Sequence, residues 1–219
     1  SRARLLCWDV PSLMGRPLRL LLVVGLLGGA AWISQGAMGS VFGTVGEETP
    51  KFEVLRSGEG YEVRRYAACT AVETTGSNPA EDNKSFGRLA KFIGVFGSPE
   101  NAAVEKIAMT APVVTFEGGS GTRMQFILPA GKHGVAPQPT DSQVQIVERP
   151  SGMVFAVQGF SGSWSHAEAA ERAAALKEKL EQDGLQVDQA QPWQFFRYNP
   201  PWTLPMLRTN EVAVPLKGL

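Results

Sequence analysis

Residues 143–160, with the sequence QVQIVERPSGMVFAVQGF, and the residues that follow them decide the fold. Polar and apolar side chains alternate from Gln143 to Val147, and Arg149-Pro-Ser-Gly152 is a typical turn sequence. A second apolar run follows, from Met153 to Phe160. Alternation with a period of two predicts β-strands, because successive side chains of a strand point to opposite faces of a sheet. We therefore predict two strands connected by a turn.

The next segment, residues 165–183, is the clearest helical pattern in the chain. Ser165 and Glu168 have the spacing of a capping box, and Gly184 is a typical helix stop. Apolar residues at three- and four-residue spacing form one face of this predicted helix: Ala169, Ala173, Leu176 and Leu180. Two further strands are predicted at residues 194–198 and 211–216. The second half of the chain thus has the order strand, strand, helix, strand, strand.

The first half of the chain repeats this order. We predict strands at residues 52–56 and 61–66, the second continuing to residue 75, and later strands at 107–116 and 124–128, joined by the hairpin loop 118–121. Between them lies a helix that ends at Gly94 or Gly97 and has an apolar face made of Phe86, Leu89, Phe92, Ile93 and Phe96. The duplication predicts an α+β fold, in which two pseudo-symmetric sheet-plus-helix repeats form a distorted β-barrel with the helices outside. A crevice between the halves would suit a flat apolar ligand.

Residues 18–38 precede this domain and are mostly apolar, without a charged side chain from Leu20 to Ile33. A membrane-spanning helix needs about 20 such residues, so we predict one N-terminal transmembrane anchor. The alternative is an uncleaved signal sequence or a buried helix. The predicted organisation is a basic segment at 1–17, the anchor at 18–38, a glycine-rich linker at 39–50 and the barrel at 51–219.

Charged residues around the anchor indicate its orientation and compartment. Four arginines precede its uncharged stretch from Leu20, opposed only by Asp9, which favours the amino terminus on the cytoplasmic-equivalent side. The chain begins at Ser1, from which we expect that an upstream piece has been removed, and a transit peptide would place the protein in a mitochondrion or plastid. The expected location is an organellar membrane, either the mitochondrial inner membrane or the thylakoid, with membrane lipid as a partner.

Composition argues against two other classes of protein. Lysine plus arginine and aspartate plus glutamate each number 21, so the chain lacks the basic surface of a nucleic-acid-binding protein. Two cysteines, Cys7 and Cys69, and two histidines, His133 and His166, have spacings unlike those of a zinc site. We expect free thiols, no metal site and no nucleic-acid partner.

Several segments resemble the SOUL haem-binding family in order and spacing. They are Tyr61-Glu-Val-Arg-Arg-Tyr66, Lys106-Ile-Ala-Met-Thr-Ala-Pro-Val113, Phe160-Ser-Gly162, Tyr198-Asn-Pro-Pro-Trp-Thr203 and Asn210-Glu-Val212. The resemblance covers residues 52–216. It implies a duplicated barrel that binds haem or another porphyrin reversibly and without a covalent bond. Some members use a histidine just after the first of these motifs as an axial ligand, but here the sequence continues Arg65-Tyr-Ala-Ala-Cys69.

The resemblance also implies which residues contact the porphyrin. In the family an early amphipathic helix contributes to the cleft, and basic residues beside it suit the two propionates. Ordinary core packing next to solvated cations gives the same pattern. The candidate tetrapyrrole-binding residues are Arg88, Leu89, Lys91, Phe92, Met109 and Trp202.

Two functions from different classes remain open. The first is a membrane-anchored, non-catalytic tetrapyrrole-binding protein. The second is an accessory subunit of a larger organellar membrane complex, in which the pocket is empty or vestigial. We expect no catalytic residues, because the sequence offers no recognisable acid–base pair or activated nucleophile. Asn210 and Glu211 are expected to hydrogen-bond to the backbone where the barrel closes.

Overall fold

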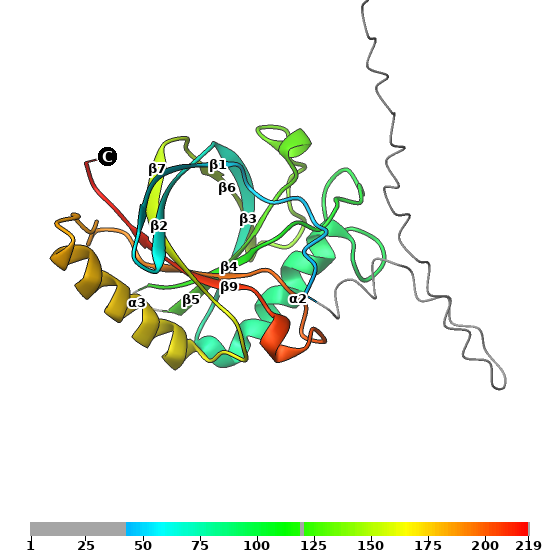
Figure 1. Cartoon of the computed structure of the whole chain (residues 1–219). Helices are drawn as coiled ribbons and strands as arrows, with labels where there is room; N and C mark the ends of the chain where they lie inside the picture. Colours follow the sequence, from blue (N-terminus) through cyan, green and yellow to red (C-terminus); the bar gives the residue numbers. More distant parts are fainter. Residues whose placement is uncertain (1–42, 119–120, 219) are drawn as a thin grey trace, which may run out of the picture. The chain divides into compact units, whose positions relative to one another are not determined.

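The structure is a computed structural model, and it describes residues 43–118 and 121–218. These residues form nine β-strands and two α-helices, with three short 3-10 helices (Figure 1). The strands are β1 Phe52–Gly58, β2 Tyr61–Tyr66, β3 Cys69–Gly76, β4 Val113–Gly118, β5 Gly121–Ile127, β6 Val144–Arg149, β7 Met153–Phe160, β8 Gln194–Arg197 and β9 Asn210–Pro215. The helices are α2 Asp82–Ile93, α3 His166–Gln182, η1 Pro79–Glu81, η2 Ala130–Lys132 and η3 Pro205–Leu207.

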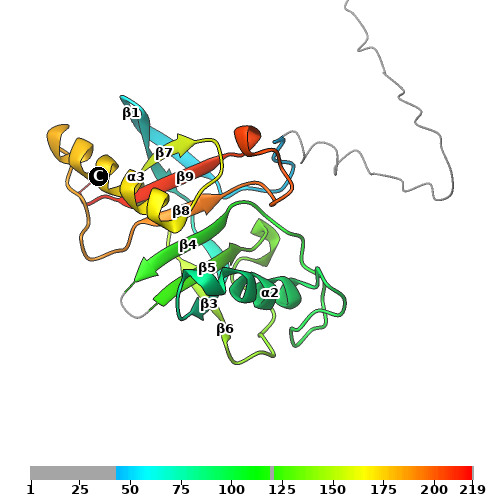
Figure 2. The same cartoon turned by 90° about the horizontal axis from the view of Figure 1, so that it is seen from below.

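All nine strands belong to one antiparallel sheet, in the order β1-β2-β7-β9-β8-β4-β5-β3-β6. The predicted α+β class is confirmed, but the predicted barrel is wrong because the sheet is not closed. β1 pairs only with β2 and β6 only with β3, so each is an edge strand. The two edges overlap in Figure 1, but Figure 2 shows them at opposite ends of the sheet. A strongly twisted sheet can curl without its edges meeting.

The sheet order shows how the two repeats are related. In the second repeat β9 lies between β7 and β8, and in the first β5 lies between β3 and β4 in the same way. The repeats meet where β4 pairs with β8. Two strands cross between the repeats. Strand β2 of the first repeat pairs with β7 of the second, and β6 of the second pairs with β3 of the first. Each half of the sheet is therefore completed by a strand from the other half.

Both helices cover the same face of the sheet, and in Figure 2 they lie in front of it. Helix α2 packs on β3 and β5, and α3 packs on β9. Alternation along each strand decides which side chains meet the helices, as in β7, where Val154 and Ala156 face the α3 core. The alternate residues Phe155 and Val157 belong to a third buried cluster on the opposite, concave face.

The second predicted helix is confirmed almost residue for residue. Ser165 caps α3 by accepting a hydrogen bond from the Glu168 backbone N–H at 3.1 Å, and Gly184 has the left-handed φ of +74° that ends such a helix. Only this half of the predicted capping box forms, since the Glu168 carboxylate instead pairs with Arg172. The four residues of the predicted apolar face are all buried in the core.

Three boundaries in the first repeat differ from the prediction. Helix α2 begins four residues earlier than its apolar pattern and ends at Gly94, whose φ is +82°. The predicted strand from 61 to 75 is two strands, interrupted at Ala67 and Ala68, because β2 and β3 lie in different halves of the sheet. The predicted strand 107–116 begins only at Val113, after the cis bond between Ala111 and Pro112.

The predicted membrane anchor, residues 18–38, lies outside the described residues. Within the described part of the chain, no helix is both long and apolar enough to cross a bilayer. The basic segment 1–17 and the first residues of the predicted linker also fall outside that part. The anchor thus stays a prediction from the sequence.

Candidate functional site

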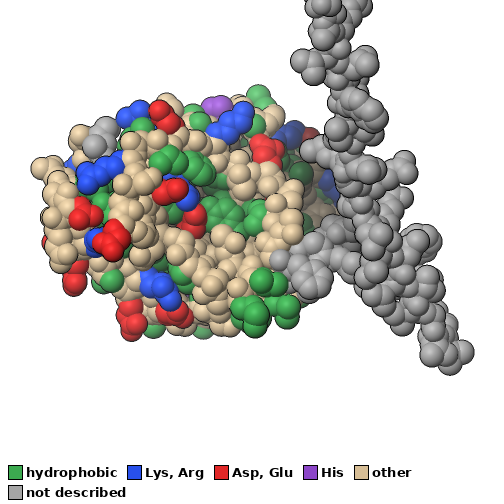
Figure 3. All heavy atoms as spheres, viewed as in Figure 1, with side chains coloured by type: hydrophobic (Ala, Val, Ile, Leu, Met, Phe, Trp, Pro, Cys, Tyr) green, Lys and Arg blue, Asp and Glu red, His purple; other side chains and the backbone are tan. Residues whose placement is uncertain are grey.

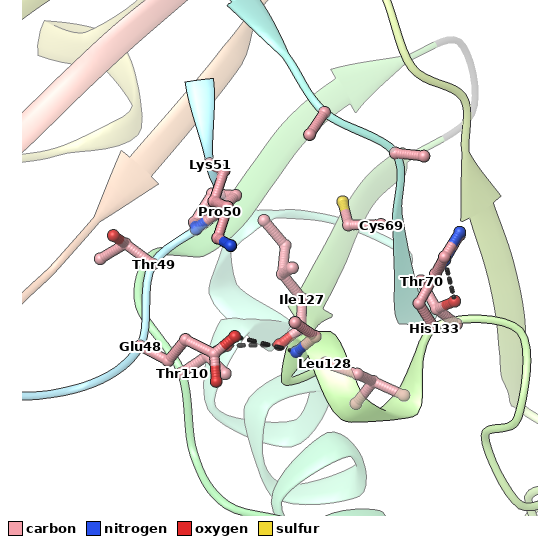
Figure 4. A pocket seen from close by; sticks show the side chains of 13 residues that line it. Glu48, Thr49, Pro50, Lys51, Cys69, Thr70, Thr110, Ile127, Leu128 and His133 are labelled. Carbon is pink, nitrogen blue, oxygen red and sulfur yellow. Dashed lines mark hydrogen bonds between the residues drawn. The ribbon is translucent and has the colours of Figure 1, made fainter. Parts of the chain in front are cut away.

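A cavity of about 150 Å³ opens between the segment that leads into β1 and the link from β2 to β3 (Figure 4). We call residues 48–51 the strap; all four line one side of the cavity. The end of β5 and the turn at η2 complete the walls. The lining residues are Glu48, Thr49, Pro50, Lys51, Ala67, Ala68, Cys69, Thr70, Thr110, Ile127, Leu128, Ala130 and His133.

Backbone and side-chain hydrogen bonds hold the strap in place. The Glu48 carbonyl accepts a bond from the Ala111 N–H at 3.0 Å, and its carboxylate accepts one from the Ala130 N–H at 2.9 Å. The Lys51 carbonyl accepts a bond from the Ala67 N–H at 3.0 Å. The carboxyl end of the predicted linker is therefore part of the cavity wall, fixed to three other segments.

Cys69 contributes a free thiol to this cavity. It is the first residue of β3 and is half-buried, and Figure 4 shows its sulfur on the side of β3 that faces Pro50 and Ile127. Burial raises the pKa of the thiol, and Glu148 raises it further, while Arg149, its partner across β3 and β6, lowers it. The net direction of the pKa is upward, so the thiol is protonated at neutral pH and has to lose its proton to bind a metal.

His133 lines the same cavity from the turn after η2. Its Nδ1 lies 3.1 Å from the Thr70 hydroxyl and 3.4 Å from the Glu148 carboxylate, and that hydroxyl donates to Glu148 at 2.9 Å. These contacts fix the imidazole at the mouth of the cavity, but it makes no hydrogen bond to Cys69. Within the described residues, no group of three or more His, Cys, Asp or Glu side chains is arranged to hold a metal ion.

A smaller cavity of about 10 Å³ adjoins the first and shares Pro50, Ala67, Cys69 and Ile127 with it. Arg149 forms part of its wall. The Arg149 guanidinium donates to two amide oxygens, Gln125 at 2.6 Å and Gln194 at 2.8 Å. Among the described residues no carboxylate lies within ion-pair distance of it, and burial lowers its pKa. Arg149 thus places a positive charge at the cavity wall, and both side chains that accept its hydrogen bonds are neutral.

Tyr66 also lines the smaller cavity and is nine-tenths buried. Its hydroxyl lies near Arg64 without a hydrogen bond of normal geometry, and burial raises the pKa of the phenol to about 12. A buried hydroxyl without a partner costs about 1–3 kcal/mol, so a ligand atom that reached it would recover part of that cost.

The concave face beside these cavities is filled by a charged network. Arg64 of β2 donates to Glu211 of β9 at 2.9 Å and to Glu62 at 2.8 Å, and the Tyr198 hydroxyl donates to Glu211 at 2.6 Å. Burial raises the pKa of Tyr198, and the Glu211 charge adds to the effect. Burial alone would lower the pKa of Arg64, but Glu211, Tyr66 and Glu62 outweigh it and leave the pKa raised. The expected backbone role holds for Asn210, which donates to the Gly162 carbonyl, and is wrong for Glu211.

The six candidate residues from the sequence lie away from the cavity. Leu89 and Phe92 are buried in the core between α2 and the sheet, and Met109 packs against the edge of that core. Arg88 is half-buried, whereas Lys91 is exposed and lies 3.6 Å from Glu100. Trp202 is exposed on the loop after β8. None of the six lines either cavity, and their contact with a porphyrin stays a prediction.

The strongest cavity residues were noticed in the sequence but not selected. Cys69 follows the first family-like motif directly, yet alternation cannot give its direction because the strand pattern breaks at Ala67 and Ala68. Arg149 is part of a predicted turn and carries no signal of its own. The break in alternation at Ala67 and Ala68 is the signal that could have located the cavity. There the chain passes from β2 in one half of the sheet to β3 in the other, and both alanines line the cavity.

Solved structures with the same fold are found among bacterial proteins. The C-terminal domain of EcmrR is 13% identical with a TM-score of 0.50, over 73% of this chain and 98% of that one. A hydrolase from Listeria innocua is 12% identical with a TM-score of 0.51, over 74% and 94%. An uncharacterised conserved protein from the same organism is 15% identical with a TM-score of 0.51, over 72% and 92%. At these identities the likeness shows the fold alone. The sequence comparison with curated proteins gives no match.

The fold and the cavities define a single-sheet α+β domain with a small, mixed polar and apolar binding site. The family model described as "SOUL heme-binding protein" matches residues 47–215, which is most of the chain. The protein therefore belongs to the SOUL haem-binding family, which confirms the resemblance seen in the sequence. Membership supports a tetrapyrrole-binding protein with non-covalent binding of haem or another porphyrin.

The residues around the cavity fit such a ligand in chemistry and, in part, in size. A soft thiol, an imidazole and two cations, Lys51 and Arg149, surround walls formed by apolar residues such as Ile127. Small-molecule pockets generally enclose about 300–1,000 Å³, so a cavity of about 150 Å³ is large enough for one edge of a porphyrin and too small for the whole ring. A deeper position requires the strap to move.

Proposed function

We propose that this protein is a membrane-anchored, non-catalytic tetrapyrrole-binding protein, and that one edge of the ring enters the cavity beneath the strap. The observation that carries the proposal is the convergence of Cys69, His133 and Arg149 on two adjoining cavities in a chain of the SOUL family.

Each wall residue has a distinct task in this proposal. Arg149 and Lys51 bind the ring's carboxylates, and Arg149 is suited to this because its partners are neutral amides that do not compensate its charge. Ile127 and Leu128 cover apolar ring atoms. When haem is the ligand, its iron supplies an acceptor for one soft or imidazole donor, and Cys69 and His133 are the two available donors.

The absence of catalysis is part of the proposal. A nucleophilic cysteine needs a lowered pKa or a hydrogen-bonded base, whereas the pKa of Cys69 is raised and its sulfur makes no hydrogen bond to His133. The other carboxylate-rich group, Glu211 with Tyr198, is tied to Arg64 and faces the filled concave side. These features support binding and release without turnover, in spite of the hydrolase among the structural neighbours.

The deciding experiment is a titration of the full chain, in mild detergent, with haemin and with iron-free protoporphyrin. Arg149→Gln and Cys69→Ser test the cavity, and the double variant Arg88→Gln with Lys91→Gln tests the helix α2 surface predicted from the sequence. We expect a Soret shift with the unchanged chain, weaker binding of both ligands by Arg149→Gln and weaker binding of haemin alone by Cys69→Ser. A loss confined to the α2 double variant would move the site to α2, and an unchanged Soret band in all samples would overturn the binding function.

Anchoring by residues 18–38 is tested separately. We expect the full chain to remain with the membrane pellet after alkaline carbonate extraction, and a chain truncated before residue 40 to be released. Cell fractionation should then place the protein in the mitochondrial inner membrane or the thylakoid. Release of the full chain by carbonate would overturn the anchor while leaving tetrapyrrole binding intact.

One observation favours the accessory-subunit function as a second candidate. The cavity holds only about half the volume of small ligand pockets, and the strap that closes it is hydrogen-bonded on three sides. An accessory subunit with a vestigial pocket would have the same small cavity and the same fixed strap. Migration of the protein as a free monomer after mild detergent extraction from its membrane would count against this candidate.

A further inference from the structure

The turn between β8 and β9 projects a cluster of apolar side chains into solvent. In this apolar loop, residues 200–207, the exposed fractions are 66% for Trp202, 44% for Leu204, 76% for Met206 and 39% for Leu207. Figure 3 shows hydrophobic side chains gathered over η3, at the lower right of the molecule. Single exposed apolar residues are ordinary, but four within six consecutive positions are not.

The segments around this loop carry no charged residue except Arg208. The backbone of Gly162 donates to the Pro205 carbonyl at 3.0 Å, and the Asn199 side chain donates to the Gly43 carbonyl at 3.2 Å, so three segments meet here. None of residues 43–46, 159–165 and 199–207 is Asp, Glu, Lys or Arg. The nearest charged residue along the loop is Arg208, and its guanidinium is bound to the carbonyls of Thr203 and Pro201.

Those hydrogen bonds also make the loop rigid. Two backbone turns, from Thr203 to Pro200 and from Leu207 to Leu204, add to the bonds of the Arg208 side chain. Pro200, Pro201 and Pro205 fix the backbone further. A preformed loop loses little conformational entropy when its apolar side chains enter another phase. Rigid exposure of this kind is unfavourable in water alone, which indicates that something covers the loop.

The path of the chain indicates that the lipid bilayer is what covers the loop. Gly43 lies against the loop, since a Cβ at this position would come within 2.2 Å of the Leu207 carbonyl oxygen. The predicted membrane span ends at Met38, so five residues separate it from this contact. Five residues reach at most about 17 Å, and the headgroup zone is about 5–8 Å thick on each side of the hydrocarbon. A loop held at Gly43 is therefore within reach of the bilayer surface.

We propose that the apolar loop docks into the interfacial zone of the bilayer beside the anchor, with Trp202 at headgroup level and Leu204, Met206 and Leu207 directed toward the acyl chains. Tryptophan is enriched at this depth because its ring is apolar and its N–H is polar. Apart from Arg208, whose guanidinium is bound to two carbonyls of the loop, the surrounding segments are uncharged, which removes most of the cost of bringing the domain against the hydrocarbon. This docking rests on the membrane anchor of the proposed function and fixes the face that the domain turns toward lipid.

The test places an environment-sensitive fluorophore at position 206, by Met206→Cys in a chain with Cys7→Ser and Cys69→Ser, reconstituted in phosphatidylcholine vesicles. The control carries the label at Val135, which has a similar exposed fraction of 68%. We expect a blue-shifted emission at position 206 that is lost when the vesicles contain lipids brominated in the acyl chains, and neither effect at position 135. The Leu204→Glu, Met206→Glu double variant should bind protoporphyrin as before. When a label is placed at position 207, this variant should leave it open to the aqueous quencher iodide, whereas the chain without the two changes should protect it.

The alternative occupants give different results. If a second copy covers the loop, the blue shift disappears when protein is diluted into more lipid, and bromine quenching is absent. If residues 1–42 cover it, the shift persists on dilution but is insensitive to bromine. Either result, or equal quenching at positions 135 and 206, overturns the docking surface. Failure of the anchor is seen separately as release by carbonate, and failure of ligand binding as an unchanged Soret band.

Discussion

Replacement of Glu211 by alanine tests whether the concave face of the sheet is dry. Arg64 contacts two carboxylates at nearly equal distance, 2.9 Å to Glu211 and 2.8 Å to Glu62. Their exposures differ, since the side chain of Glu211 is 9% exposed and that of Glu62 is 43% exposed, with Arg64 at 13%. The two pairs therefore share one guanidinium and differ mainly in solvation.

The expected magnitudes follow from that difference. Removal of one partner of a buried ion pair costs about 3–5 kcal/mol, because the remaining charge is left desolvated. Glu211→Ala also deprives the Tyr198 hydroxyl of its acceptor, so we expect the upper half of that range. Glu62→Ala breaks a solvated pair and should cost about 0–1 kcal/mol. For a domain of this size the first change lowers Tm by roughly 8–20 °C and the second by a few degrees at most.

Urea unfolding of the full chain, followed by circular dichroism, measures both variants. A fall in the midpoint at constant slope reports a change in stability alone. Equal losses for Glu62→Ala and Glu211→Ala, or a loss below about 1 kcal/mol for Glu211→Ala, would contradict the argument. In that case the concave face would be wet, and it would replace the strap cavity as the place for the tetrapyrrole.

Three further predictions concern the helices and the thiol. Ser165→Ala removes the cap of α3 and should lower stability by about 1 kcal/mol in urea unfolding, whereas Ser163→Ala should leave it unchanged. Gly94→Ala forces a side chain into a φ of +82° and to 2.7 Å from Pro99, so it should destabilise by more than about 1 kcal/mol, unlike Gly131→Ala, which meets open space. Because the pKa of Cys69 is raised and iron binds the deprotonated sulfur, haemin affinity should increase about tenfold per pH unit from about pH 6 to 8. Protoporphyrin titrations and Cys69→Ser should show no such slope.

Local sequence patterns predict the elements of this fold but not their arrangement. The alternation in 153–160 and the apolar face of 165–183 are short-range signals, and both survive in β7 and α3. The exchange of β2 and β6 between the halves is a long-range choice, and its local trace, the break in alternation at Ala67 and Ala68, does not show which strand each one pairs with. The turn Arg149-Pro-Ser-Gly152 would serve a hairpin equally well, yet the strands on either side of it pair with β3 and β2.

The same distinction explains the site. Leu89 and Phe92 were selected because they recur on one helix face, and that face is buried against the sheet as in any packed amphipathic helix. The cavity is instead assembled from segments around residues 50, 69, 110, 127 and 133, which only the folded sheet brings together. Family resemblance indicates the class of ligand, and the three-dimensional contacts are needed to propose a place for it.

The strap and Gly43, which lies against the apolar loop, belong to one continuous segment, and in our two proposals this segment connects the cavity to the membrane surface. Gly43 contacts the loop at Leu207, and Glu48, five residues later, accepts the Ala130 N–H at the cavity mouth. In our proposal, entry of more than an edge of the ring requires the contact between Glu48 and Ala130 to break. The contact between Gly43 and Leu207 then limits how far the strap can move.

Glu48→Gln weakens only the contact at the cavity mouth, because an amide oxygen is a poorer acceptor than a carboxylate. With about 1 kcal/mol lost from this exposed hydrogen bond, the open strap becomes about fivefold more populated, and stopped-flow mixing with protoporphyrin should show association faster by that factor. Glu47→Gln is the matched control, since the Glu47 side chain bonds only to the neighbouring Gly46 N–H. Equal association rates for the two variants would mean that the ring enters without displacing the strap, and the cavity of about 150 Å³ would then have to admit it from the side of Arg149.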